Sequence, residues 1–511
     1  MNASIFPRCC GILLHVTSLP GAHGIGDLGA SAYEFVEFLA QSGQKIWQVL
    51  PLGPTGYGDS PYQLFSAFAG NPLLIDLNAL QEQGLLSAQD LTAASALPDD
   101  HVEYGAVIDV KRRLIRHASR TFFADGGRAD LAAFDIFCCE NADWLADYSL
   151  FMACKAVFHD AVWADWDHGV RRRDPSVLEE CRQKLAPEIS VHKFAQFEFF
   201  RQWQKLKLHC QSRGICIMGD IPIYVAHDSA DVWAHPELFR LDEYSRPTAV
   251  AGVPPDYFSA TGQLWGNPLY RWDVSAASGH RWWIDRFRAS LKLFDHVRLD
   301  HFRGFEAFWE VPATASTAQE GKWVKGPGAP LFRAVKAELE VLPFVAENLG
   351  VITPEVEALR QEFGFPGMSL LQFAFGNDPQ GPSFRPHNYS RELAAYTGGH
   401  DNDTTVGWWN SSGIGESTRT AEDIRKERAF ARAYLGCKED EPINWVLIRA
   451  VHASVADIAI VPLQDVLGLG SEARMNLPGT LSGNWKWRYQ AQALTPDLIA
   501  RLRELTVLYD R

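Results

Sequence analysis

The sequence predicts an α/β fold, and within that class a (β/α)8 barrel. Eight short apolar runs follow one another along the 511-residue chain, and amphipathic helical stretches lie between several of them. Continuous apolar runs of this length are typical of strands buried on both faces, and their alternation with helices indicates a parallel sheet. A doubly wound sheet would show the same alternation. Acidic residues at the ends of several runs favour the barrel, where catalytic groups gather at the carboxyl ends of the strands.

The predicted strands are residues 11–16, 46–50, 215–220, 295–300, 344–347, 369–373, 394–397 and 458–463. The clearest helices, with apolar residues at helical spacing, are predicted at 31–41 and 354–363. The first run is short and is interrupted by His15, so we interpret it as a barrel strand rather than a signal peptide. The apolar stretch 445–463 contains charged residues, so no membrane span is predicted there.

The spacing of the strands predicts one large insertion. About 165 residues separate the second run from the third, far more than one crossover needs. Part of this gap, residues 131–158, is apolar at helical intervals and is broken by Asn141 and Asp143. We therefore predict an inserted, largely helical subdomain at residues 78–194.

The rest of the chain, residues 1–77 and 195–511, is predicted to form the catalytic barrel with loop insertions. The main insertion, residues 222–270, is rich in Pro, Gly and aromatic residues and is expected to be irregular loop. No C-terminal β-domain is expected, because the pattern from Asn476 to Arg511 is mostly helical.

The amino-acid composition limits the classes of partner that the protein can bind. The formal net charge of −14 argues against nucleic acid or an anionic membrane surface, both of which attract basic proteins. The nine cysteines are odd in number and lack a Cys-x-x-Cys pair, which fits a reducing cytoplasm better than a disulfide framework. Without spaced Cys/His clusters, no metal site is predicted.

The first candidate catalytic residue is Asp300, at the end of the fourth run. Arg298 lies two residues earlier, so on a strand both side chains point to the same side. The guanidinium would keep the carboxylate ionised, as a nucleophile requires. A structural ion pair at the barrel rim explains the same two residues equally well.

The second candidate is Glu347, which follows the apolar residues Val345 and Ala346. Partial burial and nearby carboxylates would raise its pKa, so that it could serve as a general acid. The alternative is a carboxylate at a helix N-terminus, but this explains Glu355, beside Pro354, better than Glu347.

Asp401, the third candidate, follows His400 and a glycine pair that leaves room for a ligand. A carboxylate next to an imidazole suits hydrogen bonding to adjacent sugar hydroxyls, although Asp-Asn-Asp is also a turn sequence. Asp220, at the end of the third run, is equally well explained as a turn carboxylate before Pro222. Carboxylates at three strand ends indicate glycosidic bond cleavage, which uses one as nucleophile and one as proton donor.

Aromatic residues in Gly/Pro-rich loops form a second layer of candidates. Tyr57 and Tyr62 lie in one such loop, and Trp265 lies in another that spans residues 254–268. Pyranose faces stack on rings, while their edges need planar hydrogen-bonding groups. Such groups are available in the second loop from Asp256, Gln263 and Asn267.

At these residues the chain resembles the amylomaltases, the 4-α-glucanotransferases of glycoside hydrolase family 77, which are relatives of the α-amylases. The resemblance covers nearly the whole chain. The motifs that carry it are Leu14–Pro20, Pro51–Gln63, Pro254–Tyr270 and Asn476–Thr480. Tyr224 and Val225 stand where amylases usually carry an Asn-His pair, which fits family 77 better than a plain amylase.

The resemblance implies roles for these residues. Asp300 matches the nucleophile, Glu347 the general acid/base and Asp401 the third carboxylate. The remaining matches are to substrate-binding positions: Arg298 and His400 in the donor site, Asp256, Trp265 and Asn267 in the covering loop, Tyr57 and Ser60 on the acceptor side, and Phe373 after the sixth strand. Malto-oligosaccharides would be both donor and acceptor, with no cofactor. A glucan hydrolase and a non-catalytic glucan-binding barrel remain as alternatives.

Overall fold

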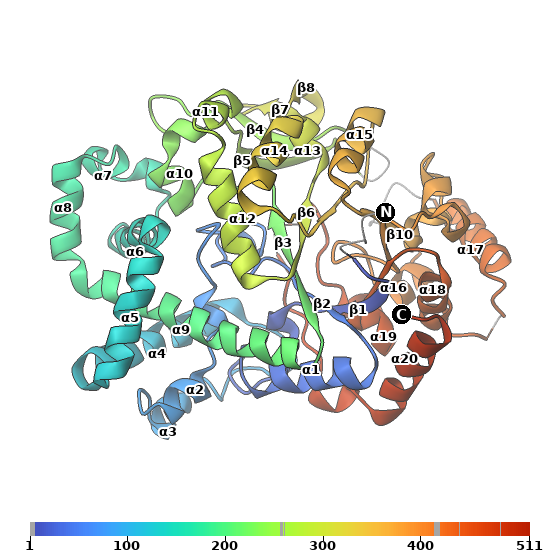
Figure 1. The fold of residues 1–511 in the computed structure, drawn as a ribbon, viewed down its shortest axis with the longest axis horizontal. Coiled ribbons are helices and arrows are strands. Elements are labelled where there is room, and N and C mark those ends of the chain that lie inside the picture. Colours follow the sequence, from blue (N-terminus) through green and yellow to red (C-terminus); the bar gives the residue numbers. More distant parts are fainter. Residues whose placement is uncertain (1–5, 256–258, 260, 413–419, 439, 481) are drawn as a thin grey trace.

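The structure is a computed structural model that describes residues 6–255, 259, 261–412, 420–438, 440–480 and 482–511. Its centre is a parallel eight-stranded sheet in the order β10-β11-β12-β1-β2-β3-β6-β9 (Figure 1). The strands are β1 (Cys9–Leu13), β2 (Ile46–Gln48), β3 (Cys216–Pro222), β6 (His296–Asp300), β9 (Phe344–Ala346), β10 (Gly367–Leu370), β11 (Leu393–Tyr396) and β12 (Ile458–Pro462). All eight predicted strands are confirmed.

The sheet curves back on itself, so that its first and last strands meet. The backbone N–H of Ala346 in β9 donates to the carbonyl of Pro366, just before β10, at 2.8 Å. The amide N–H of Met368 in β10 donates to the side-chain oxygen of Asn348 at 2.7 Å. The predicted (β/α)8 barrel is therefore confirmed.

Helices pack against the outside of this barrel. The two predicted helices are α1 (Ala30–Gln41) and α15 (Pro354–Phe363). The second begins with a proline in its first turn and ends at Gly364 in the left-handed conformation, φ 68°, both usual termini. Further helices between or after the strands are α12 (Arg281–Leu293), α14 (Gly328–Leu339), α18 (Ile443–Ala453), α19 (Leu463–Leu467) and α20 (Pro496–Leu508).

The long segment between β2 and β3 is largely helical. It contains α2 (Leu77–Glu82), α3 (Ala88–Leu91), α4 (Tyr104–Asp125), α5 (Arg128–Glu140), α6 (Ala142–Val157), α7 (His168–Arg171), α8 (Pro175–Lys184) and α9 (Ala186–Ser212). The expected break at Asn141 separates α5 from α6, while Asp143 lies in the first turn of α6. Because α9 runs without interruption through residue 194, the proposed subdomain boundary stays a prediction.

The prediction of irregular loop at residues 222–270 was wrong for part of that segment. Two strands there join a four-stranded antiparallel sheet in the order β5-β4-β7-β8. Its strands are β4 (Ala249–Val253), β5 (Gln263–Pro268), β7 (Ala307–Pro312) and β8 (Lys322–Lys325). The partner of β4 is β7, which follows the next barrel strand. The sequence therefore contains no local hairpin pattern that would predict this pairing. The sheet lies beyond the carboxyl ends of β3 and β6 (Figure 1).

The alternation of side chains along β6 decides what faces the interior. Val297 and Leu299 belong to the large apolar core between the barrel and its helices. Arg298 and Asp300 point to the other side and line a cavity at the barrel mouth. Below them, the barrel interior is closed by apolar side chains such as Ile46, Met218 and Val345. The alternation of side chains along β6 therefore places both charged groups at the mouth of the barrel.

Within the described part of the chain, no helix has the length and apolar character needed to cross a membrane.

Candidate active site

One cavity of 1840 Å³ opens at the carboxyl ends of the barrel strands. Asp300 is the last residue of β6, and Glu347 directly follows β9. Asp401 lies five residues after the end of β11. All three candidate carboxylates line this cavity, although they come from three different strand ends. The volume exceeds the roughly 300–1,000 Å³ of a pocket for one small molecule, which indicates an extended ligand.

Arg298 connects two carboxylates under the cavity floor. Its Nη1 atom lies 2.6 Å from Oδ2 of Asp220 and 3.0 Å from Oδ1 of Asp300. The hydroxyl of Tyr62 donates to the same Oδ2 of Asp220 at 2.8 Å. Asp220 is buried behind Arg298 and holds the guanidinium in place. It is therefore not an exposed turn carboxylate. Arg298 is thereby held against the inner side of Asp300.

Glu347 is fixed by backbone donors from two loops. The N–H of His301, the residue after Asp300, donates to its Oε2 at 2.8 Å. The N–H of Leu349 donates to its Oε1 at 2.8 Å. His301 has a left-handed backbone, φ 50°, a conformation that non-glycine residues seldom adopt. The turn after the β6 carboxylate thus binds the β9 carboxylate directly.

The electrostatics of the centre disfavour full ionisation. Burial raises the pKa of Asp300, and Asp220, Glu347 and Asp401 raise it further, while Arg298 opposes them. Burial also raises the pKa of Glu347, again opposed by Arg298. Because several buried carboxyl groups face one guanidinium, the centre can retain a proton near neutral pH. Arg298 contacts Asp300 directly and so favours the charge on that residue and the proton on Glu347.

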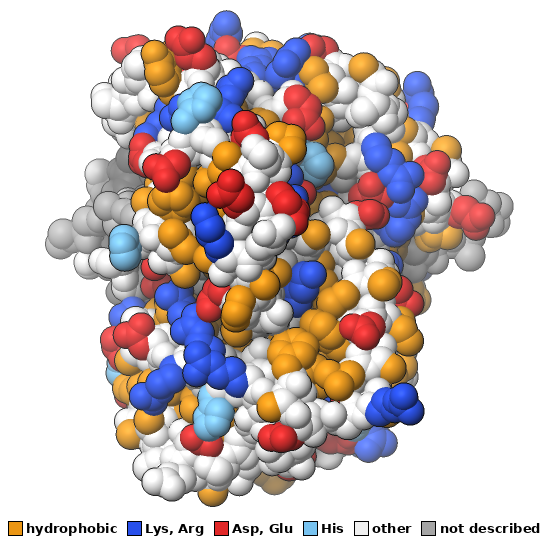
Figure 2. Space-filling model, turned by 90° about the vertical axis from the view of Figure 1, so that its left-hand side faces the viewer, with side chains coloured by type: hydrophobic (Ala, Val, Ile, Leu, Met, Phe, Trp, Pro, Cys, Tyr) orange, Lys and Arg blue, Asp and Glu red, His pale blue; other side chains and the backbone are white. Residues whose placement is uncertain are grey.

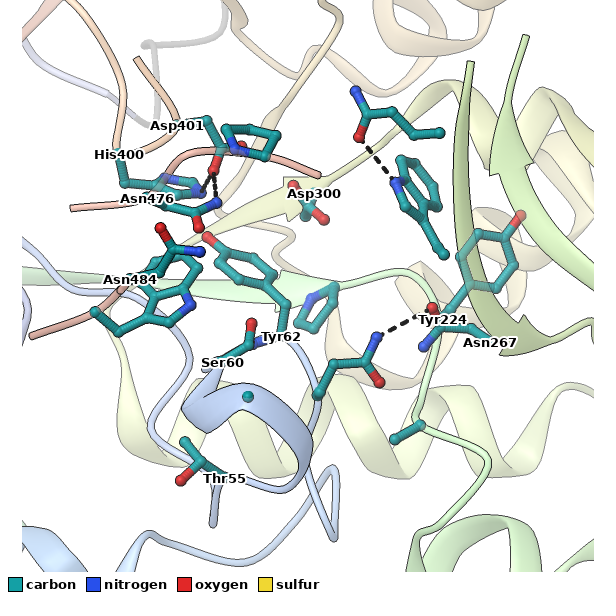
Figure 3. A pocket seen from close by; sticks show the side chains of 18 of the residues that line it. Thr55, Ser60, Tyr62, Tyr224, Asn267, Asp300, His400, Asp401, Asn476 and Asn484 are labelled. Atoms are coloured by element: carbon teal, nitrogen blue, oxygen red, sulfur yellow. Dashed lines mark hydrogen bonds and ion pairs between the residues drawn. The ribbon is translucent and has the colours of Figure 1, made fainter. Parts of the chain in front are cut away.

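Asp401 lies close to His400 and Asn476, to one side of Asp300 (Figure 3). Its Oδ1 accepts a hydrogen bond from Nδ2 of Asn476 at 2.7 Å and lies 3.4 Å from Nε2 of His400. The ring of His400 stacks on Tyr62, with centroids 5.1 Å apart and an interplanar angle of 15°. Burial lowers the pKa of His400, so the imidazole is neutral at neutral pH. Asp401 itself remains half exposed to the cavity, where it can accept hydrogen bonds from a ligand.

Another wall of the cavity is formed by β5. Nε1 of Trp265 donates to Oε1 of Gln263 at 3.1 Å, and the indole meets the ring of His301 edge to face at 4.8 Å. Nδ2 of Asn267 donates to the carbonyl of Val225 at 2.9 Å. Rings and planar amides are therefore presented together, as recognition of sugar faces and edges requires.

The structure brings together most of the predicted site residues. Those that line the cavity are Asp300, Glu347, Asp401, Arg298, His400, Tyr62, Ser60, Gln263, Trp265, Asn267 and Phe373. Asp220 lies behind Arg298. Asp256 is outside the described residues, and of Tyr57 only the backbone, in a short 3-10 helix, is described.

Sequence reasoning did not identify two groups of this site. Asn476 was noted only within a family motif, although its contact with Asp401 spans 75 residues of chain. His301, the residue after Asp300, was not singled out from the sequence. Its Nε2 atom is buried and makes no hydrogen bond to the described protein atoms. Proximity to a candidate nucleophile was the only available signal for His301.

Elsewhere, His23, Asp27 and Asp76 form a cluster whose ligand atoms could hold a metal ion. The ammonium group of Lys111, fully buried, lies 3.6 Å from Oδ2 of Asp27. It also donates to the carbonyls of Leu73 and Ile75. A cation is therefore already supplied by the protein at this cluster.

The barrel and its carboxylates define a class of enzymes that act on glycosidic bonds. Residues 14–495 match the glycoside hydrolase 77 family model, described as 4-alpha-glucanotransferase. The chain belongs to this family, and the resemblance stated from the sequence is confirmed.

Individual relatives agree with this assignment. The chain is 51% identical over 512 residues to a 4-alpha-glucanotransferase of Thermus thermophilus, with 99% of each chain covered. It is 51% identical over 507 residues to one of Synechocystis, covering 99% of this chain and 98% of the relative. Among solved structures it is similar to the amylomaltase from Streptococcus agalactiae in complex with acarbose, with a TM-score of 0.93, 40% identity and 99% of both chains covered.

Proposed function

We propose that this protein is a 4-α-glucanotransferase that moves α-1,4-glucan segments from one malto-oligosaccharide to another with retained anomeric configuration. The observation that carries the proposal is the hydrogen bond from the N–H of His301 to Oε2 of Glu347. It ties the carboxyl group of Glu347 to the residue next to Asp300, so both acids can flank one glycosidic bond. We expect their carboxyl groups to lie about 5–5.5 Å apart, as in retaining enzymes.

In the first step, Glu347 protonates the bridging oxygen while Asp300 attacks the anomeric carbon. A β-linked glycosyl-enzyme forms and the reducing-end portion of the donor leaves. Charge develops on the sugar ring in the transition state, and the carboxylates of Asp300 and Asp401 stabilise it. Asn476 and His400 hold Asp401 in position for hydrogen bonds to the ring hydroxyls.

In the second step, the 4-hydroxyl oxygen of an acceptor glucan attacks the anomeric carbon in place of water and forms the new α-1,4 bond. Glu347, now ionised, takes the hydroxyl proton, and the bond to Asp300 breaks. Two inversions give net retention. Aromatic residues such as Trp265 favour a sugar over water as acceptor, because they offer ring faces that a sugar can cover and water cannot.

The partners and location follow from the same features. The Streptococcus agalactiae relative was solved with acarbose, which supports an oligosaccharide ligand for this cavity. On the side of the molecule that carries α7 and α8, acidic and basic side chains are interspersed with hydrophobic ones (Figure 2). We also propose a cytoplasmic location, which the nine free cysteines support.

The test is incubation with maltotriose, with separation of the products and a count of reducing ends. Transfer predicts glucose together with longer oligosaccharides at a constant number of reducing ends. A steady rise in reducing ends would indicate the hydrolase alternative. Unchanged maltotriose would indicate a non-catalytic glucan-binding barrel.

A further inference from the structure

Trp323 is another of the tryptophans that line the cavity. Trp323 lies on β8, the edge strand of the four-stranded sheet, and 37% of its surface is exposed. The two lysines on the same strand, Lys322 and Lys325, extend into solvent. A partly exposed indole that lines a cavity can offer a ring face to a ligand.

The plane of this indole is fixed from one side. The guanidinium of Arg303 lies 3.5 Å from the ring centroid, and Arg303 is itself buried. Its Nη1 donates to the carbonyl of Val351. Trp309, opposite Trp323 in the strand pairing, meets the ring at 66° with centroids 5.1 Å apart. The indole is thus immobilised before any ligand arrives, which lowers the entropic cost of binding.

Arg303 connects this ring to the two catalytic loops. Arg303 is three residues after Asp300, and Val351 is four residues after Glu347. Val351 is 47% exposed and lines the cavity beside them. Through Arg303 and Val351, Trp323 is connected to the loop of Glu347, the proposed proton donor, which must face the leaving group and the acceptor.

We propose that Trp323 is a stacking platform for a glucose unit of a long acceptor, beyond the unit that supplies the reacting 4-hydroxyl. The proposal rests on the glucanotransferase function. A pyranose ring would lie on the face of the indole opposite Arg303. The platform would select for acceptor length and would not affect the chemistry at the anomeric carbon.

The experiment compares acceptors of different length with one activated donor, α-maltosyl fluoride. In Trp323→Leu, the KM for maltopentaose as acceptor should rise roughly three- to tenfold, the value of one aromatic stacking contact. The KM for glucose, too short to reach the platform, should change less than twofold. Trp323→Tyr, which keeps a flat ring, should restore most of the effect. Tyr244→Leu is the matched control, an aromatic residue that is 60% exposed and does not line the cavity.

A second variant covers the case in which Trp323→Leu is poorly folded, as thermal unfolding would show. Val351→Lys leaves the indole in place and puts a long charged side chain beside it, and it should give the same dependence on acceptor length. Equal KM values for maltopentaose in all variants, or equal losses with glucose and maltopentaose, would overturn the platform. If the unsubstituted protein transfers no maltosyl group to any acceptor, the proposed function fails, and the platform fails with it.

Discussion

Nη1 of Arg298 lies 3.0 Å from Oδ1 of Asp300, two residues later on the same strand, and both side chains face the barrel mouth. This pair turns a strand end into a charged site. The guanidinium is almost fully buried and holds Asp220 on its other side at 2.6 Å. It contacts both Asp220 and Asp300 directly, and so favours negative charge on these two carboxylates.

We expect Arg298→Met to abolish transfer and to destabilise the fold. Removing one partner of a buried ion pair costs about 3–5 kcal/mol, because the remaining charge is left uncompensated. Thermal unfolding and transfer rates with maltotriose measure the two effects. The control is Arg333→Met, which removes an exposed pair with Glu362 at 2.6 Å, worth about 0–1 kcal/mol. Equal melting temperatures for both variants would contradict the role of Arg298 as the buried counter-charge.

Asn476→Ala should slow transfer and leave the fold intact. The side chain donates to Asp401 at 2.7 Å, and a hydrogen bond to a charged group contributes about 1.5–3 kcal/mol. Because Asp401 is half exposed, we expect the lower end of this range, a loss of about tenfold in kcat/KM for maltotriose. Asn388→Ala, which removes an exposed hydrogen bond to Pro382, is the matched control. Similar kcat/KM values for both variants would show that Asn476 does not position Asp401.

The buried His452 should make stability depend on pH. Burial and the nearby charges of Arg511 and Arg8 lower its pKa from 6.5 to about 4 in the folded state. Between these pH values the unfolded chain binds a proton that the folded chain does not. Stability is therefore complete above about pH 6.5 and falls as the pH drops toward 4, by up to about 3 kcal/mol for this residue.

The variant His452→Leu should flatten the decline in melting temperature between pH 7 and pH 5. His387→Leu, at an exposed histidine, should leave the decline as it is. A decline that is the same in the unsubstituted protein and in His452→Leu would rule out this residue as a source of the pH dependence.

The barrel was predictable because most of its buried strands are continuous apolar runs, and acidic residues at the strand ends are conspicuous beside them. The small sheet was not, because β4 pairs with β7 across the intervening strand β6. Contacts between residues far apart in the chain could not be predicted from the sequence either. Tyr62 reaches Asp220 across 158 residues, and Asn476 reaches Asp401 across 75. The family resemblance implies roles for Tyr57 and Asp256. The structure does not describe these two side chains, so their roles remain predictions.

Asp300 is the proposed nucleophile at the anomeric carbon, and Glu347 is the proposed acid for the same glycosidic bond. The most direct measurement is covalent trapping with 5-fluoro-α-glucosyl fluoride, followed by mass spectrometry of peptides. We predict one glycosyl adduct on the peptide that contains Asp300, and none at that position in Asp300→Asn. An adduct on the peptide of Glu347 or Asp401, with Asp300 unmodified, would contradict the account.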